Sequence, residues 1–176
     1  MATVRQVAEA EIGQDVSQQL QALLQASFPG YPSRSYYKLP PHFRYLAETG
    51  DAVVAQVGVE LRMIRVGGHV FRTFGVADLC VTERERSHGL ASRLLTEVTE
   101  LARACAVDFV ILFADDDRLY LRNGWARAAN TCSWLKIHEH RTVGLATAVP
   151  TGALLVKAIG SRDWPAGDVD LLGYLF

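Results

Sequence analysis

The sequence predicts a mixed α/β sheet, and two observations support this prediction. Strand-like apolar stretches alternate with stretches of helical periodicity, in the order strands, helix, strand, helix and further strands. Such alternation is typical of a sheet that carries helices on its faces. The length and composition agree, because 176 residues with 49% hydrophobic and 21% charged residues suit one domain with a hydrophobic core. We therefore expect a single domain over residues 1–176.

The first half of the chain is expected to hold a helix and several strands. The helix covers Asp15–Ala26, where four apolar residues fall roughly on one face. The segment Phe28–Pro41 is rich in proline and aromatic residues and cannot form a long regular element. Gly67-Gly68 is a hairpin-turn signal between two of the strands. The strands are expected at Thr3–Ala8, Ala52–Arg65, Val70–Phe74 and Ala77–Thr82.

The second half is expected to begin with a helix and to end in strands. The helix covers Leu90–Ala106 and carries an apolar stripe. The apolar run Asp108–Ala114 predicts a buried strand. A short helix, Asp116–Arg122, is expected to end at Asn123-Gly124, which is a C-cap signal. Two late strands, expected to be antiparallel to each other, cover Ala128–Ile137 and Ala153–Ile159.

Charge and composition exclude several functional classes. The net charge of −1 argues against a nucleic-acid binder that works through a basic face. No apolar run approaches a membrane span, and the N-terminus lacks a signal-peptide core, so we expect a cytoplasmic protein without a membrane partner. The pair His138 and His140 lacks the further ligands of a metal site. The run Asp115–Asp117 opens a short helix and is better explained by N-capping and the helix dipole, so no metal is expected. The sequence does not decide whether the protein forms a homodimer.

The most informative stretch runs from Val81 to Ala91 and reads Val-Thr-Glu-Arg-Glu-Arg-Ser-His-Gly-Leu-Ala. It lies between a predicted strand and a predicted helix, so its backbone N–H groups lie at a helix N-terminus. Those N–H groups lack partners inside the helix, and the helix dipole makes that end partly positive. A pyrophosphate is a natural ligand for such a place. The alternative is a solvated charged loop, because Glu83–Arg86 alternates in sign.

Two motifs resemble those of a known superfamily. The spacing Arg86-x-x-Gly89-x-Ala91 is similar to the Arg/Gln-x-x-Gly-x-Gly/Ala signature of the GNAT acyltransferases, and Tyr120–Trp125 resembles their YxxxGF element. The resemblance covers roughly Ala52–Ile159. It implies the GNAT fold, a mixed central sheet of about six to seven strands flanked by about four helices, with acetyl-CoA as the cosubstrate.

The chain also departs from the fullest form of this pattern and carries narrower resemblances. Ser87 and His88 replace the usual Gly-Lys or Gly-Gln, and Ala91 replaces the final glycine, so there is less room for a close backbone approach. Ser33–Tyr36 and Asp163–Asp168 resemble segments of the rhizobial nodulation-factor N-acyltransferases. The second segment also resembles the tail of the aminoglycoside 2′-N-acetyltransferases.

The resemblance assigns roles to individual residues. Tyr120 would donate a proton to the departing CoA thiolate; the alternative is a helix aromatic packed in the core. Asp78 would be the general base that removes the amine proton, or else a carboxylate satisfied by backbone or by an arginine such as Arg72. Main-chain groups would hold acetyl-CoA, including an oxyanion donor where the strand splays near its end. The CoA-binding residues are expected to be Leu79, Cys80, Val81, Arg86, Ser87, His88, Gly89, Leu90, Ala91 and Ser92.

The expected activity is therefore transfer of an acetyl group to a primary amine of a small molecule or amino sugar. Transfer is expected to be direct, because Cys80 and Cys132 lack any evident activating histidine. Tyr36 and Tyr37 would contact the acceptor from a mobile aromatic and basic lid, or else belong to an ordered loop packed on the core. Two alternatives remain: a longer acyl donor, as in the nodulation-factor enzymes, and a CoA-binding regulatory module without activity.

Overall fold

The computed structural model describes residues 2–176, which form two compact units. The first unit comprises the chain up to Glu60 together with Val76–Val98, and the second comprises Leu61–Gly75 together with Thr99–Phe176. Three elements pass through both units: strands β3 (Ala52–Val66) and β4 (His69–Val81), and helix α2 (Leu90–Ala104).

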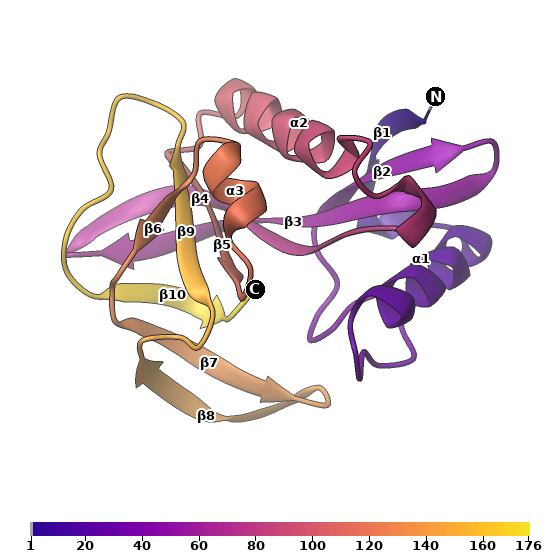
Figure 1. Ribbon diagram of the computed structural model, residues 1–176. Helices are drawn as coiled ribbons and strands as arrows, with labels where there is room; N and C mark the ends of the chain where they lie inside the picture. Colours follow the sequence, from indigo (N-terminus) through magenta and orange to yellow (C-terminus); the bar gives the residue numbers. More distant parts are fainter. Residues whose placement is uncertain (1) are drawn as a thin grey trace. The chain divides into compact units, whose positions relative to one another are not determined.

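The first unit places an amphipathic helix against a small antiparallel sheet (Figure 1). Strand β1 (Thr3–Ala8) pairs with β2 (Phe43–Thr49), and β2 pairs with the first part of β3. Helix α1 (Gln14–Ser27) extends one residue beyond the predicted helix at each end. Its apolar face joins side chains of the strands in one core, formed by Val7, Leu20, Leu23, Leu24, Tyr31, Leu46, Val53 and Cys80.

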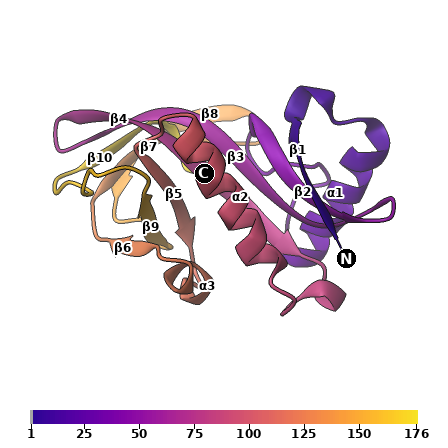
Figure 2. The ribbon, with the colours of Figure 1, turned by 90° about the horizontal axis from the view of Figure 1, so that it is seen from above.

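Strands β3 and β4 form a long hairpin (Figure 2). The predicted turn is confirmed, because Gly67 and Gly68 have φ angles of 53° and 90°, which glycine adopts without steric cost. The prediction of two strands, Val70–Phe74 and Ala77–Thr82, was wrong, because β4 runs unbroken through Gly75. The glycine serves packing here rather than a turn: a Cβ at Gly75 would lie 1.9 Å from the ring of Phe176.

The second unit contains the larger part of the sheet. The strand order of the sheet is β6-β9-β5-β4-β3-β10-β7-β8. Strand β5 is parallel to β4 and β10 is parallel to β7, whereas β10 with β3, β5 with β9, β6 with β9 and β7 with β8 are antiparallel, so the predicted mixed sheet is confirmed. The remaining elements are β5 (Phe109–Ala114), α3 (Arg118–Arg122), β6 (Ala126–Ala128), β7 (Cys132–His138), β8 (Arg141–Ala148), β9 (Ala153–Ala158) and β10 (Val169–Tyr174).

The sheet has more strands than expected. Residues 2–176 form ten strands and three α-helices, with two short 3-10 helices at Glu9–Glu11 and Glu83–Glu85, instead of six to seven strands and four helices. The predicted strand Ala128–Ile137 is split between β6 and β7, and only β6 pairs with β9. Strand β8 escaped prediction because it lacks a buried face; Leu145, for example, is 80% exposed. Strand β10 was not predicted, because the Trp-Pro-Ala-Gly turn before it indicated the end of the domain.

Aromatic and aliphatic side chains fill the core of the second unit. Phe109 contacts Phe71 and Trp164 edge-on, at ring-centroid distances of 5.2 and 5.0 Å. The indole of Trp164 donates to Asn130 Oδ1 (2.9 Å), which anchors the segment before β10. Within residues 2–176, none of the helices combines the length and the apolarity that a membrane crossing requires.

Candidate active site

The turn between β4 and α2 leaves its main chain accessible. Ser87 and Gly89 have φ angles of 66° and 79°, and α2 begins at Leu90. A Cβ at Gly89 would meet no atom within 4 Å, so no other element seals the turn there. Left-handed residues in such turns orient N–H groups into concave anion-binding surfaces, and the start of α2 adds the positive end of a helix dipole. The arrangement is therefore suited to a diphosphate.

The side chains of this turn are exposed, which also agrees with the alternative that the turn is a solvated charged loop. The Arg86 guanidinium donates to the Val81 carbonyl (3.3 Å), and His88 Nδ1 lies 3.4 Å from Glu85 Oε2. These contacts fold the charges back on the turn itself. Ser87 occupies a left-handed position where the family pattern has glycine, and such a conformation costs a non-glycine residue about 1–2 kcal/mol.

A cavity of about 500 Å³ borders the same turn within the first unit. Its walls combine apolar side chains of α1 with polar groups of the turn, so it can take a ligand that has both kinds of surface. No sequence pattern indicates this cavity, because its lining residues are far apart in the chain. The lining residues are Gln19, Ala22, Leu23, Ala26, Ser27, Val53, Thr82, Glu83 and Arg86.

Asp78 has an unusual backbone in the middle of a strand. Its φ angle is 55°, although it lies within β4. The carboxylate accepts a hydrogen bond from the Tyr31 hydroxyl (2.6 Å), and the carbonyl accepts one from Gln56 Nε2. The suggested alternative partner, Arg72, instead uses its backbone N–H to bind Asp108 Oδ2 (2.9 Å). Burial raises the pKa of the Asp78 carboxyl, against the opposing effects of Tyr31, Arg44 and Lys38.

The residues after Asp78 complete the end of β4. Leu79 and Val81 are partly buried, and Cys80 is buried with its sulfur 3.9 Å from Gln56 Nε2. Burial raises the pKa of the Cys80 thiol to about 12, so the sulfur is a neutral thiol at neutral pH and a poor nucleophile. The splaying of β4 near its end stays a prediction; Thr73–Gly75 of β4 pair with β5.

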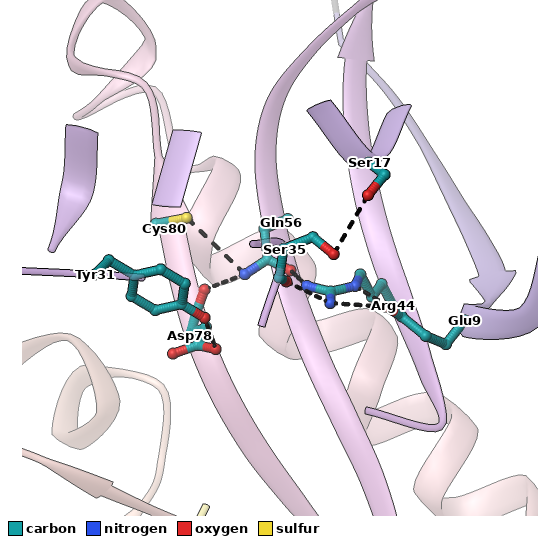
Figure 3. Close-up of polar contacts among 8 residues, drawn as sticks. All are labelled: Glu9, Ser17, Tyr31, Ser35, Arg44, Gln56, Asp78 and Cys80. Carbon is teal, nitrogen blue, oxygen red and sulfur yellow. Dashed lines mark hydrogen bonds and ion pairs between the residues drawn. The ribbon is translucent and has the colours of Figure 1, made fainter. Parts of the chain in front are cut away.

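Arg44, which the sequence suggested as a basic residue of the lid, is instead buried and is linked to Asp78 through Gln56 (Figure 3). Arg44 is 1% exposed and donates to both carboxylate oxygens of Glu9 (2.6 and 3.1 Å). It also donates to Gln56 Oε1 (2.9 Å) and to the Ser35 carbonyl (2.7 Å), so its charge is paired and hydrogen-bonded. An arginine inside the strand-like run Phe-Arg-Tyr-Leu-Ala was the available signal.

The aromatic loop after α1 is pinned near Asp78. Arg34 Nε donates to the carbonyls of Tyr36 (3.1 Å) and Tyr37 (3.2 Å), and the Arg34 guanidinium lies over the Tyr36 ring. The ring of Tyr37 lies 5.5 Å from that of Tyr31, which binds Asp78, yet Tyr37 is 52% exposed. The contacts match the ordered-loop alternative, and they leave the Tyr37 ring accessible to a ligand.

Tyr120 belongs to the second unit. Its ring packs edge-on against Trp125 at 5.8 Å, and Gly124 has a φ angle of 76°, which confirms the predicted end of the short helix. Burial and the nearby Asp116 charge raise the pKa of Tyr120 to about 12, so its hydroxyl keeps its proton at neutral pH. The Trp125 indole N–H is buried and has no hydrogen-bond acceptor within the described residues. Tyr120 thus combines a packing contact with a protonated hydroxyl.

Comparison with known proteins identifies the family. The family model described as "Acetyltransferase (GNAT) domain" matches residues 3–128. The chain belongs to the GNAT acetyltransferase family. No curated protein matches its sequence. Within residues 2–176, no group of three or more His, Cys, Asp or Glu side chains is arranged to hold a metal ion.

Solved structures of other proteins share the fold. YhbS from Escherichia coli, in complex with CoA, is 22% identical, with a TM-score of 0.65 over 97% of this chain and 89% of that one. A GNAT family acetyltransferase from Brucella melitensis, in complex with acetyl-CoA, is 16% identical, with a TM-score of 0.61 over 95% and 94%. Eis1 from Mycobacterium abscessus is 14% identical, with a TM-score of 0.61 over 76% of this chain but 33% of that protein. The narrower resemblances to nodulation-factor and aminoglycoside enzymes are not shown by these matches.

Proposed function

We propose that this GNAT protein transfers an acetyl group from acetyl-CoA directly to a primary amine of a small molecule or amino sugar. The observation that carries the proposal is the accessible left-handed turn at Ser87 and Gly89 before α2. Membership of the family supports it, as do the CoA and acetyl-CoA complexes of proteins with the same fold. Main-chain groups from Arg86 to Ser92 would hold the diphosphate.

Asp78 is the proposed general base. A primary amine has a pKa of about 10 and arrives protonated, so one proton must leave before its lone pair can attack the thioester carbonyl. Asp78 takes that proton, and a carboxylate whose pKa is raised by burial is a stronger base than an exposed one. Backbone N–H groups of Leu79–Val81 would stabilise the oxyanion that forms.

Tyr120 is the proposed general acid. When the tetrahedral intermediate collapses, the carbon–sulfur bond breaks and the thiolate of CoA leaves with the electron pair. The Tyr120 hydroxyl is protonated at neutral pH and supplies the hydrogen bond and then the proton. The neutral thiol of Cys80 supports direct transfer without an acyl-enzyme. Tyr36 and Tyr37 are the proposed contacts of the acceptor.

Acetyl transfer from acetyl-CoA to a panel of amines tests these roles. Asp78→Asn and Tyr120→Phe are each expected to lower kcat by about 10²–10⁴-fold, which is the usual contribution of a general base or acid. The matched controls are Asp163→Asn, on the exposed surface, and Tyr45→Phe, in the core of the first unit. Both controls are expected to keep wild-type activity. Full activity in the two site variants would refute the assigned roles.

The same panel separates the alternative functions. Fatty acyl-CoA donors test the longer acyl chain: turnover with these donors and none with acetyl-CoA would replace the proposed donor. A regulatory CoA-binding module would bind CoA in calorimetry and acylate no amine. The absence of any CoA binding would overturn the proposal entirely.

A further inference from the structure

Tyr31 lies in the aromatic segment Phe28–Pro41 and holds the carboxylate of Asp78. It is 8% exposed, and its hydroxyl lies 2.6 Å from Asp78 Oδ2. The centroid of its ring lies 5.9 Å from that of Phe28 and 5.5 Å from that of Tyr37. A buried phenol that contacts two other aromatic rings has little freedom, and its hydroxyl is directed at one oxygen of the carboxylate (Figure 3).

The backbone of Asp78 is held separately, from strand β3. Gln56 donates from Nε2 to the Asp78 carbonyl and accepts at Oε1 from Arg44. Arg44 is in turn fixed by Glu9 and by the Ser35 carbonyl. The left-handed backbone of Asp78 is therefore fixed by one set of contacts and its carboxylate by another (Figure 3).

We propose that Tyr31 is a positioning residue for the general base: its hydroxyl fixes the orientation of the Asp78 carboxylate and stabilises its charged form. The inference rests on the proposed function, in which Asp78 accepts the amine proton. Without the hydroxyl, the carboxylate would lose the one side-chain hydrogen-bond donor that it has within residues 2–176.

The groups around Asp78 determine the direction in which its pKa should move when the Tyr31 hydroxyl is removed. Burial raises the pKa of the carboxyl and Glu60 adds to the effect, whereas the Tyr31 hydrogen bond and the charges of Arg44 and Lys38 lower it. Cys80, two residues away, is a neutral thiol. Burial and the Asp78 charge raise the pKa of Tyr31 itself, so its hydroxyl remains a donor over the working pH range. Removal of the hydroxyl must therefore raise the pKa of Asp78 further.

The pH dependence of kcat/KM for Tyr31→Phe distinguishes positioning from packing. Phenylalanine keeps the ring and its contacts with Phe28 and Tyr37, so a role in packing alone predicts an unchanged profile. The proposal predicts that the acidic limb moves to higher pH, so that the loss of kcat/KM is larger at neutral pH than at alkaline pH, where the carboxylate is charged in both proteins. A loss by the same factor at every pH, or no loss, would overturn it. Tyr45→Phe is the control, because it also removes a buried tyrosine hydroxyl, one that donates to Gln6 Oε1 (3.5 Å).

A measurement that needs no turnover separates this inference from the proposed function. The carboxyl carbon of Asp78, assigned with Asp78→Asn, can be titrated by ¹³C NMR in the wild-type protein and in Tyr31→Phe. The expected result is a higher titration midpoint in the variant. An unchanged midpoint overturns the inference, whatever the activity. A raised midpoint in a protein that acetylates nothing supports the Tyr31–Asp78 coupling and refutes the proposed function.

Discussion

A Cβ added at Gly89 should separate the binding of CoA from the stability of the fold. Gly89 has a φ angle of 79°, and alanine in a left-handed conformation costs about 1–2 kcal/mol. For a chain of 176 residues this corresponds to a fall in Tm of about 2–8 °C. The new methyl group would meet no protein atom within 4 Å, so no packing penalty adds to that cost. Gly89→Ala should therefore fold.

The same methyl group would occupy the space that a diphosphate needs. A hydrogen bond to a charged group contributes about 1.5–3 kcal/mol, so the loss of one N–H contact to the diphosphate should raise the Kd for CoA by about 10- to 100-fold. Isothermal titration calorimetry with CoA measures this directly, and a thermal melt measures stability in the same sample. Adenosine lacks the diphosphate, and its affinity should not change.

Ser87→Gly is the matched control, because it removes a Cβ from a left-handed residue of the same turn. The relief of strain is offset by about 0.5–1 kcal/mol of extra freedom in the unfolded chain, so stability should stay within about 1 kcal/mol of wild type. CoA affinity should be equal or higher, since the family pattern has glycine there. If Gly89→Ala melts lower but binds CoA with the wild-type Kd, the turn does not hold the diphosphate.

Two further predictions concern stability. Asp78 has a raised pKa in the folded state, so folding takes up protons and stability falls as pH rises from the unfolded value of 3.8 through the folded pKa. Asp78→Asn removes that cost and keeps an oxygen acceptor for Tyr31; its Tm should exceed that of wild type at pH 7, with the gain lost below about pH 3.8 in melts across pH. Gly75→Ala would bring a Cβ to 1.9 Å from the Phe176 ring and should cost about 1–3 kcal/mol in urea unfolding. In a Phe176→Ala background that cost should nearly vanish; equal costs in both backgrounds would contradict the contact.

Local chemistry determined which parts of the fold could be predicted. Helix α1 and the Gly67-Gly68 turn follow from periodicity and from backbone preference, which are local properties of the chain. Strand β2 was missed because it follows Pro40-Pro41 and carries Arg44, whose burial depends on Glu9 and Gln56 elsewhere in the chain. Strand β8 was missed because its apolar residues face outwards rather than a core.

In the candidate site, too, features of the local sequence could be predicted and contacts between distant residues could not. The turn at Arg86–Gly89 was predicted because a strand, a glycine and a helix follow one another in sequence. The partner of Asp78 was not predicted, because Tyr31 is 47 residues away and no pattern links the two positions. The left-handed backbone of Asp78 was also beyond prediction, because nothing in the local sequence marks an aspartate within a strand for that conformation.

The pairing of β10 with β3 has a consequence for synthesis of the protein on the ribosome. Val66 of β3 pairs with Val169 of β10, and the ribosome adds Val169 about one hundred residues after Val66. At roughly 5–20 residues per second, one edge of the growing hairpin stays without its strand partner for about 5 to 20 s. Unpaired strand edges attract other chains. The nascent protein should therefore depend on chaperones or on dilute conditions until its final segment emerges.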